Sequence, residues 1–169
     1  DRITTVSADD TILSGSRWSA ESDLDIRAGG DLTLTRESRT TDLTQGSRTT
    51  LGDRTQLFVN GPTGELSLDA EGDVTITGSD IINQGTGATT IEAVNNLTIN
   101  TAREQDVFQQ GGISITRENI EGSSIQTGGD LTLEADNNVS MQSVSIKSGQ
   151  TLTIRGNDVD ITADKNTLD

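Results

Sequence analysis

The sequence predicts an all-β protein, a parallel β-helix (β-solenoid) with about 20 to 21 residues and three short strands in each coil. Three observations support this fold class: short segments alternate apolar and polar residues, turns rich in Gly, Asn and Asp separate them, and similar segments return one coil later. No stretch of useful length has the period of an amphipathic helix.

The alternation is clearest in residues 128–162, which contain four related segments, GGDLTLE, DNNVSMQ, GQTLTIR and GNDVDIT. Each begins with residues that tolerate positive φ and continues as a strand with one apolar and one polar face. We therefore predict that the apolar residues point inward and the Thr and Ser between them point outward. The predicted inward residues are Leu32, Leu34, Val74, Ile76, Leu97, Ile99, Leu131, Leu133, Leu152 and Ile154.

The spacing of equivalent positions predicts how the coils stack. Leu152 lies 21 positions after Leu131, and position 159 lies 20 positions after position 139. In a β-solenoid each strand pairs with its equivalent one coil later. The turn pairs 95–96 and 137–138, both Asn-Asn, are interpreted as structural corners two coils apart.

Composition is consistent with a narrow core. Only 30% of the residues are hydrophobic and 2% aromatic, and the net charge is −15. These values are typical of disordered chains, but such chains do not keep strict alternation. An aliphatic core stacked along an axis explains both observations. Trp18 is predicted to occupy a partly buried core or cap position rather than to serve as an exposed binding anchor.

The sequence also has a longer repeat, roughly three times the length of one predicted coil. Residues 7–18, 70–81 and 135–146 resemble one another. We interpret residues 1–169 as a single β-helical segment of a larger protein. Its long repeats are expected at about 1–35 (partial), 36–101 and 102–166.

Two blocks rich in Thr, Ser, Gln and Arg, residues 36–64 and 103–129, depart from the coil pattern. Residues 57–59 and 113–115 within them still read as coil strands. Each block is either an elaborated coil or hairpin packed on the side of the helix, or a protruding arm that contacts a partner.

The segments GGDLTLEADNNVSMQ, AEGDVTITGSDI and NDVDITA, with Thr/Arg-rich intervals between them, resemble the hemagglutinin repeats of filamentous hemagglutinins and of the related CdiA effectors of contact-dependent growth inhibition. This resemblance covers essentially the whole chain. It implies a right-handed β-helix from a large exoprotein of a Gram-negative bacterium, secreted or held at the cell surface.

The resemblance also implies a function and partners. We expect a non-catalytic structural or adhesive segment that forms a filament stalk, mediates cell adhesion or helps deliver a C-terminal toxin to target bacteria. Expected partners are proteins or glycans on the target cell and, during export by two-partner secretion, an outer-membrane transporter. The isolated segment is expected to be monomeric. The absence of Cys suits passage through a pore as an unfolded chain, and the sequence shows neither a signal peptide nor a membrane-length apolar run.

A carbohydrate-active β-helix enzyme is the alternative. Its candidate carboxylates are the pairs Asp23 and Asp25 and Asp158 and Asp160, with Asp136 about one coil before Asp158. The chain has no His and no Cys and only three aromatic residues, so we predict no catalytic, cofactor-binding or metal-binding residues.

Charge and acidic corners bear on two further kinds of ligand, calcium and nucleic acid. The acidic corners that could bind Ca²⁺, weakly at most, are Asp9, Asp10, Asp73 and Asp130. An acidic surface repels phosphate, which excludes nucleic acid as a partner.

Overall fold

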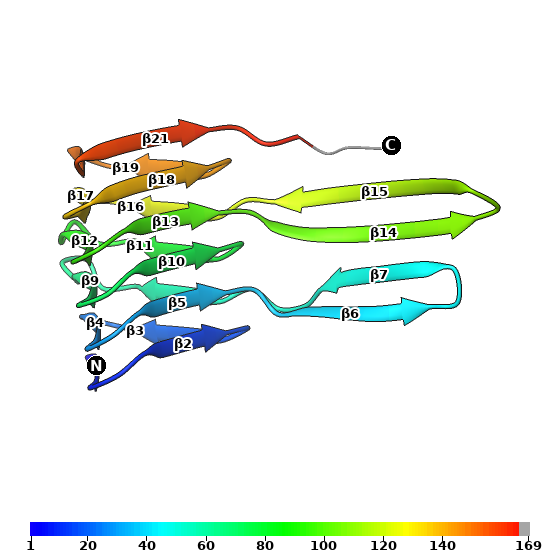
Figure 1. The fold of residues 1–169 in the computed structure, drawn as a ribbon. Helices are drawn as coiled ribbons and strands as arrows, with labels where there is room; N and C mark the ends of the chain where they lie inside the picture. Colours follow the sequence, from blue (N-terminus) through cyan, green and yellow to red (C-terminus); the bar gives the residue numbers. More distant parts are fainter. Residues whose placement is uncertain (166–169) are drawn as a thin grey trace.

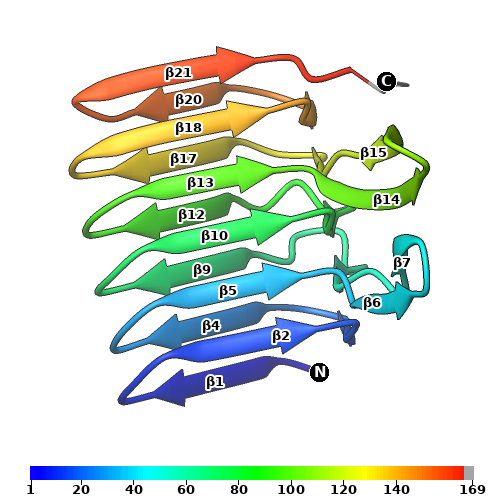
Figure 2. The ribbon, with the colours of Figure 1, turned by 45° about the vertical axis from the view of Figure 1, so that its right-hand side comes forward.

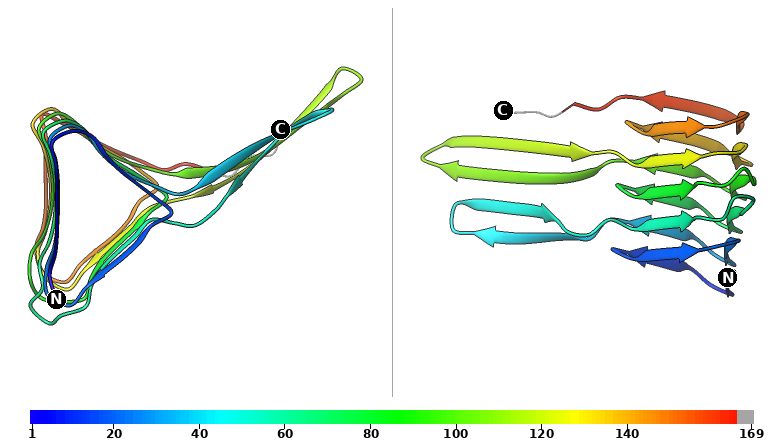
Figure 3. Two further views of the ribbon diagram at one scale, coloured as in Figure 1. Left: turned by 90° about the horizontal axis from the view of Figure 1, so that it is seen from below. Right: turned by 180° about the vertical axis from the view of Figure 1, so that it is seen from behind.

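The computed structural model describes residues 1–165, which form 21 β-strands and no helix (Figure 1). Three parallel sheets wind around one axis and give a triangular cross-section (Figure 3). Viewed from the N-terminal end, the chain turns clockwise as it recedes, so the helix is right-handed (Figure 3). The parallel β-helix predicted from the sequence is confirmed.

Each of the first five coils supplies one strand to each of the three sheets, and the last described coil supplies β20 and β21. Figure 2 shows the successive strands of the first two sheets. The first sheet contains β1 (Ile3–Ser7), β4 (Leu24–Ala28), β9 (Leu66–Ala70), β12 (Thr89–Ala93), β17 (Leu131–Ala135) and β20 (Leu152–Arg155). The second contains β2 (Thr11–Ser14), β5 (Leu32–Thr35), β10 (Val74–Thr77), β13 (Leu97–Asn100), β18 (Asn138–Gln142) and β21 (Asp158–Thr162). The third contains β3 (Arg17–Ala20), β8 (Gln56–Val59), β11 (Asp80–Asn83), β16 (Ser124–Thr127) and β19 (Ser145–Ser148).

The register confirms the predicted stacking. Leu131 pairs with Leu152, and residue 139 pairs with residue 159. Along the first sheet, paired residues are 21, 42, 23, 42 and 21 positions apart. The two longest of these intervals are single coils that contain an inserted hairpin. The Asn pairs at 95–96 and 137–138 therefore lie one coil apart, and the expectation of two coils was wrong.

The core is a set of aliphatic rows that run along the axis. Eight of the ten predicted inward residues are fully buried, from Leu32 in the second coil to Leu133. Leu152 is 44% exposed because β20 is the last strand of its sheet among the described residues, and Ile154 is partly buried for the same reason. Trp18 is half-buried and packs at the start of the row that continues through Leu57, as predicted.

Carboxylates close the corners from one coil to the next. Asp10 accepts a hydrogen bond from the Asp31 N–H at 2.9 Å, and Asp31 accepts one from the Asp73 N–H at 2.8 Å. Asp73 in turn accepts both the backbone and the side-chain N–H of Asn96. At another corner Asp130 accepts the N–H of residue 151 at 2.8 Å. These bonds satisfy backbone donors that the turns would otherwise leave unpaired.

The corner between the second and third sheets takes two forms. In three coils, two residues connect the strands, and the first has a left-handed backbone: Gly15 (φ 57°), Gly78 (φ 53°) and Ser143 (φ 49°). Gly adopts this conformation without steric cost, whereas Ser143 does so at some strain. In the other two coils a β-hairpin replaces this short turn.

The hairpins are β6 (Ser38–Leu43) with β7 (Gly46–Leu51), and β14 (Ala102–Gln110) with β15 (Ile113–Glu121). They leave the solenoid at alternate coils and point in the same direction (Figure 1). Strand β14 pairs antiparallel with β7, so the hairpins form one four-stranded sheet in the order β15-β14-β7-β6. We call this sheet the arm, residues 36–54 and 102–121.

The arm resolves the two interpretations of the Thr/Arg-rich blocks in favour of protrusion (Figure 3). Residues 57–59 lie in β8 inside the solenoid, as predicted. Residues 113–115 lie in β15 instead, and both Ile side chains there are exposed. The local alternation is the same in both segments, but pairing with β14 places the second segment outside the core.

We expect Leu133→Asp to destabilise the protein by several kcal/mol, because Leu133 is fully buried and the carboxylate would have no polar partner in the core. Thr132→Asp, one residue away and facing outward, should cost less than about 1 kcal/mol. Urea unfolding followed by circular dichroism measures both changes. Equal midpoints for the two variants would contradict the assignment of inward and outward faces.

Candidate interaction surface

The arm differs in charge from the solenoid that carries it. It holds six of the 12 Lys and Arg residues and seven of the 27 Asp and Glu residues, which gives it a net charge of −1. The rest of the chain carries the remaining −14. Like charges repel at short range, so the arm is the part of this molecule that an acidic surface can approach at the lowest electrostatic cost.

An ion-pair network fastens the arm at its root. Arg36 pairs with Glu121, which is 85 positions away in the sequence. Arg54 pairs with Asp80 of the solenoid and with Glu121 at 3.3 Å, and its guanidinium donates to the Gly122 carbonyl oxygen at 3.0 Å. One carboxylate therefore joins the base of the first hairpin to the end of the second.

The environment of Glu121 shifts its acidity. Burial raises the pKa of Glu121, but hydrogen bonds and Coulombic attraction from Arg36 and then Arg54 outweigh burial, so the pKa lies below its ordinary value of 4.5. The side chain is 35% exposed, so solvent weakens these interactions.

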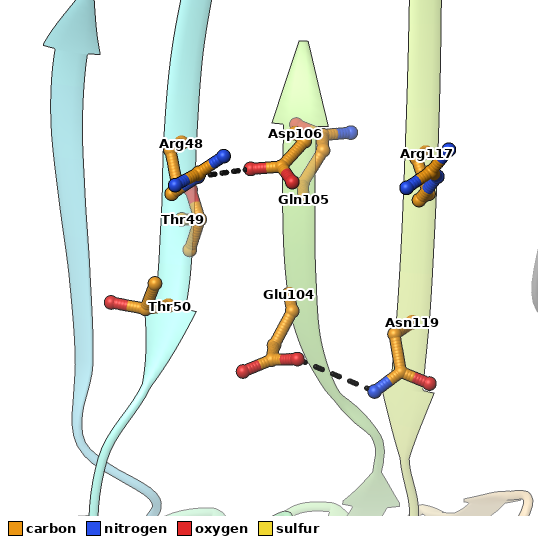
Figure 4. Close-up of a pocket in the computed structure, with 8 residues that line it drawn as sticks. All are labelled: Arg48, Thr49, Thr50, Glu104, Gln105, Asp106, Arg117 and Asn119. Atoms are coloured by element: carbon orange, nitrogen blue, oxygen red, sulfur yellow. Dashed lines mark hydrogen bonds and ion pairs between the residues drawn. The ribbon is translucent and has the colours of Figure 1, made fainter.

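One face of the arm carries cross-strand rows of charged and polar side chains. In one row Arg48 of β7 contacts Asp106 of β14 at 2.7 Å, and Arg117 of β15 lies opposite Asp106 (Figure 4). In the row nearer the solenoid Asn119 donates to Glu104 at 3.4 Å. With neighbouring residues, these side chains line an open depression of about 300 Å³.

The same face becomes apolar toward the tip. Side chains alternate between the two faces along each strand, so Phe108, two residues beyond Asp106, shares its face. The register places Leu43 and Ile115 in the row of Phe108, and Ile113 one row farther out. These four side chains are 43–64% exposed. We call them the tip patch.

The opposite face of the arm is already engaged near its root. Arg103 pairs with Glu118 at 3.3 Å and also with Asp164, which follows β21. Gln105 donates to Glu118 at 2.8 Å. The face with the tip patch is therefore the one that offers apolar side chains for contact.

The carboxylates proposed for an enzyme are not brought together. Asp25 pairs with Arg27 at 3.2 Å, and Asp23 accepts the Glu65 N–H at 3.1 Å. Asp158 pairs with Asn138 in the sheet rather than with Asp136, and Asp160 pairs with Ser140. Within residues 1–165 no group of three or more His, Cys, Asp or Glu side chains has an arrangement that could hold a metal ion.

The structure also contains a group of carboxylates that the sequence did not predict. Asp69, Glu92 and Glu134 are neighbours across the first sheet, and with Asp136 they line a depression of about 180 Å³. The pairing of strands from coils of unequal sequence length brings these carboxylates side by side. No local sequence pattern could therefore have indicated the group. Arg155 lies 3.8 Å from Glu134 and offsets part of the charge.

The residues that fasten the arm had only a partial signal in the sequence. Both Thr/Arg-rich blocks begin with Arg-Glu, at 36–37 and 103–104, which marks the two hairpin starts. Nothing local links residue 36 to Glu121 or residue 54 to Asp80, because these pairs depend on the stacking of coils. Among the described residues there is no helix long and apolar enough to cross a membrane.

Residues 109–168 match the family described as the hemagglutinin repeat. The matched region begins near the end of β14 and continues through β15 and the last coils, which is close to one of the long repeats seen in the sequence. Over residues 109–168 the match supports the filamentous hemagglutinin-type repeat that the sequence resembles. Neither the curated proteins nor the solved structures give a match to the chain.

We expect Glu121→Gln to lower the melting temperature near pH 7 by at most about 2–4 °C, since a partly exposed ion pair contributes less than about 1 kcal/mol. Because folding lowers the pKa of Glu121, its ionisation stabilises the fold above pH 4.5, and this contribution disappears as the pH falls through the folded pKa. The difference between wild type and variant should therefore shrink below pH 4.5.

Glu65→Gln, which removes an exposed carboxylate on the solenoid, is the control and should leave the melting temperature near pH 7 close to that of wild type. A wild-type advantage that persists unchanged at pH 2 would contradict the role assigned to Glu121.

Chelation tests whether the acidic corners bind Ca²⁺. Asp10, Asp73 and Asp130 already accept backbone N–H groups, so we expect excess EDTA to leave the circular dichroism spectrum and melting temperature unchanged. A melting temperature that falls by more than about 5 °C on chelation and recovers with Ca²⁺ would show instead that a bound ion contributes over about 1 kcal/mol.

Proposed function

We propose that this chain, which carries a hemagglutinin repeat, is a non-catalytic stalk and adhesion segment of a large exoprotein, secreted or displayed at the surface of a Gram-negative bacterium. The observation that carries the proposal is that the solenoid and the arm are separate parts of the fold with different surfaces. A continuous solenoid gives length and stiffness, and a separate arm offers a contact surface away from the acidic body.

The solenoid suits a stalk because it grows by repetition. Every coil adds one strand to each of three parallel sheets, so backbone hydrogen bonds run along the axis without interruption. Each coil adds about 4.8 Å, the spacing of paired strands. Length then requires only more coils, with no new kind of core.

The arm suits adhesion because it leaves the solenoid at one corner and exposes mixed chemistry. Arginine, carboxylate and amide groups line its inner rows, and apolar side chains occupy its tip. We propose that it contacts a protein or glycan on a target cell. Delivery of a C-terminal toxin to target bacteria is the second form of this proposal, in which the arm engages the envelope of the recipient. In either form an outer-membrane transporter is the partner during export.

The structural role is favoured over a carbohydrate-active enzyme by where the carboxylates lie. Asp10 and Asp73 hold corners, and Asp25 is paired with Arg27. The acidic group around Glu92 has no aromatic residue among those that line its depression, and the chain has no His to serve as acid or base.

A variant without the arm tests the proposal. The short turns of the other coils show how to remove it: residues 36–54 and residues 101–122 are each replaced by one Gly. This joins the strands as Gly78 and Ser79 join β10 and β11, with Thr55 or Ser123 in the place of Ser79. We expect this variant to keep its β-rich circular dichroism and to lose most binding to target cells.

Fluorescently labelled wild type and variant are compared on Gram-negative bacteria and on animal cells. Binding to animal cells alone supports adhesion, and binding to bacteria supports delivery. Equal binding by wild type and the folded armless variant would contradict the role of the arm. Release of reducing sugars from acidic polysaccharides would favour the enzyme instead.

A further inference from the structure

We propose that the face of the arm with the tip patch binds a single carboxylate-bearing sugar at the end of a glycan. The inference rests on the adhesion role proposed above and names the class of ligand that the arm takes. It combines an exposed arginine without an acidic partner, hydroxyl-binding groups beside that arginine, and an aromatic ring one row farther out.

The charge of this face favours an anionic ligand. Outward from Glu121, which the root arginines already hold, the register places three arginines and two carboxylates on it. They are Arg39, Arg48, Arg117, Glu104 and Asp106. These side chains sum to a charge of +1 on a chain that carries −15 as a whole. The face is therefore a local positive region on an acidic protein.

Arg117 is the side chain best placed to bind the anion. Its cross-strand neighbour Asp106 is already held by Arg48 at 2.7 Å. Arg117 is exposed, and among the described residues it forms no ion pair. A guanidinium presents parallel N–H donors that match the two oxygens of a carboxylate. A ligand carboxylate therefore meets Arg117 without displacing an existing pair.

The groups next to Arg117 suit the hydroxyls of a sugar. Asp106 lies beside it, and Glu104 and Asn119 are linked at 3.4 Å in the next row toward the solenoid (Figure 4). Carboxylate and amide side chains accept and donate hydrogen bonds to hydroxyl groups. The depression that these residues line, about 300 Å³, lies at the lower end of small-molecule sites, so it suits one sugar ring.

Phe108 supplies a flat apolar surface for the face of that ring. It lies one row beyond Asp106 on the same face and is 43% exposed. Ile115 is its direct cross-strand neighbour, so Arg117 occupies a diagonal position, at a distance of roughly 7–8 Å. One sugar ring therefore reaches both side chains, with its carboxylate on Arg117 and its C–H face on Phe108.

The solenoid limits the ligand to few negative charges. Outside the arm the chain carries −14. A long sulfated or phosphorylated polymer on this face would extend past the solenoid and be repelled by it. A terminal sugar with one carboxylate brings a single charge, which Arg117 offsets.

The exposure of the face makes each contact weak. An ion pair in contact with water contributes little, so one arm should bind the sugar with a dissociation constant on the order of 1 mM. Arms repeated along a stalk and glycans clustered on a cell would raise the overall affinity.

Titration of the intact 169-residue chain with methyl glycosides, followed by ¹H–¹⁵N NMR, tests the proposal. Methyl galactopyranosiduronate and methyl galactopyranoside are a matched pair that differs only in the carboxylate. We expect the acid to shift amide signals of β14 and β15 and to bind at least about fivefold more tightly than the neutral sugar. The methyl glycoside of N-acetylneuraminic acid, compared with the uronate, distinguishes the two sources of a sugar carboxylate.

Substitutions locate the site. Arg117→Gln should weaken binding of the acid about fivefold and leave binding of the neutral sugar unchanged. Phe108→Leu, which removes the flat ring, should weaken binding of both sugars. The control is Arg155→Gln, which removes an arginine of the solenoid whose side chain is 68% exposed and should change neither affinity. Circular dichroism verifies that all three variants are folded.

Several results would overturn the proposal: equal binding of the acidic and neutral glycosides, equal effects of Arg117→Gln and Arg155→Gln, binding of acetate or of an acidic peptide as tight as that of the uronate, or tighter binding of heparin at this face. These results are distinguishable from a failure of the adhesion role. If the armless variant loses cell binding but Arg117→Gln has no effect, adhesion stands and the sugar acid is rejected. If the armless variant binds cells as wild type does, adhesion is rejected whatever the titration shows.

Discussion

The spacing of hydrogen-bonded strands, about 4.8 Å, is the constraint on which the rest of this structure depends. One coil supplies one strand to each solenoid sheet, so the axis advances by one strand spacing per coil. A hairpin supplies two strands to the arm, so it needs two coils of rise. Hairpins at alternate coils therefore stack in register, and β7 meets β14 without a gap. The long repeat of the sequence is thus two short coils and one hairpin.

Side-chain chemistry follows from that geometry. Each inward position lies above its equivalent, so mostly aliphatic residues stack from coil to coil, which explains how 30% hydrophobic residues suffice for the core. The buried polar exceptions Asn83, Thr89 and Thr127 hydrogen-bond to one another. Corner carboxylates such as Asp31 and Asp73 satisfy the backbone of the next coil. Much of the acidity that could suggest metal binding or catalysis is thus used to close turns.

The distribution of charge separates the two parts of the molecule. The acidic solenoid resists association along its sides, and the nearly neutral arm concentrates both arginine and apolar side chains. Arg36 and Arg54 meet Glu121 where the arm joins the solenoid, so the two hairpins are tied to each other at the root of the arm. Adhesion would use this separation, because contact through the arm keeps the acidic solenoid away from the surface that is bound.

The sequence alone determined most strands of the solenoid, their inward faces and the coil-to-coil partners near the C-terminal end, since the alternation at Leu131–Leu133 and the return of the pattern at Leu152 are local and periodic. It also indicated that residues 36–64 and 103–129 differ from the coils. Only the tertiary structure decided that Ile115 leaves the core, that Asn95 lies one coil from Asn137, and that Phe108 joins Leu43 in one patch. The physical reason is that these contacts depend on how far the solenoid rises along its axis. A coil that contains an inserted hairpin rises by one strand spacing, as a short coil does, so separation in the sequence does not give separation along the axis.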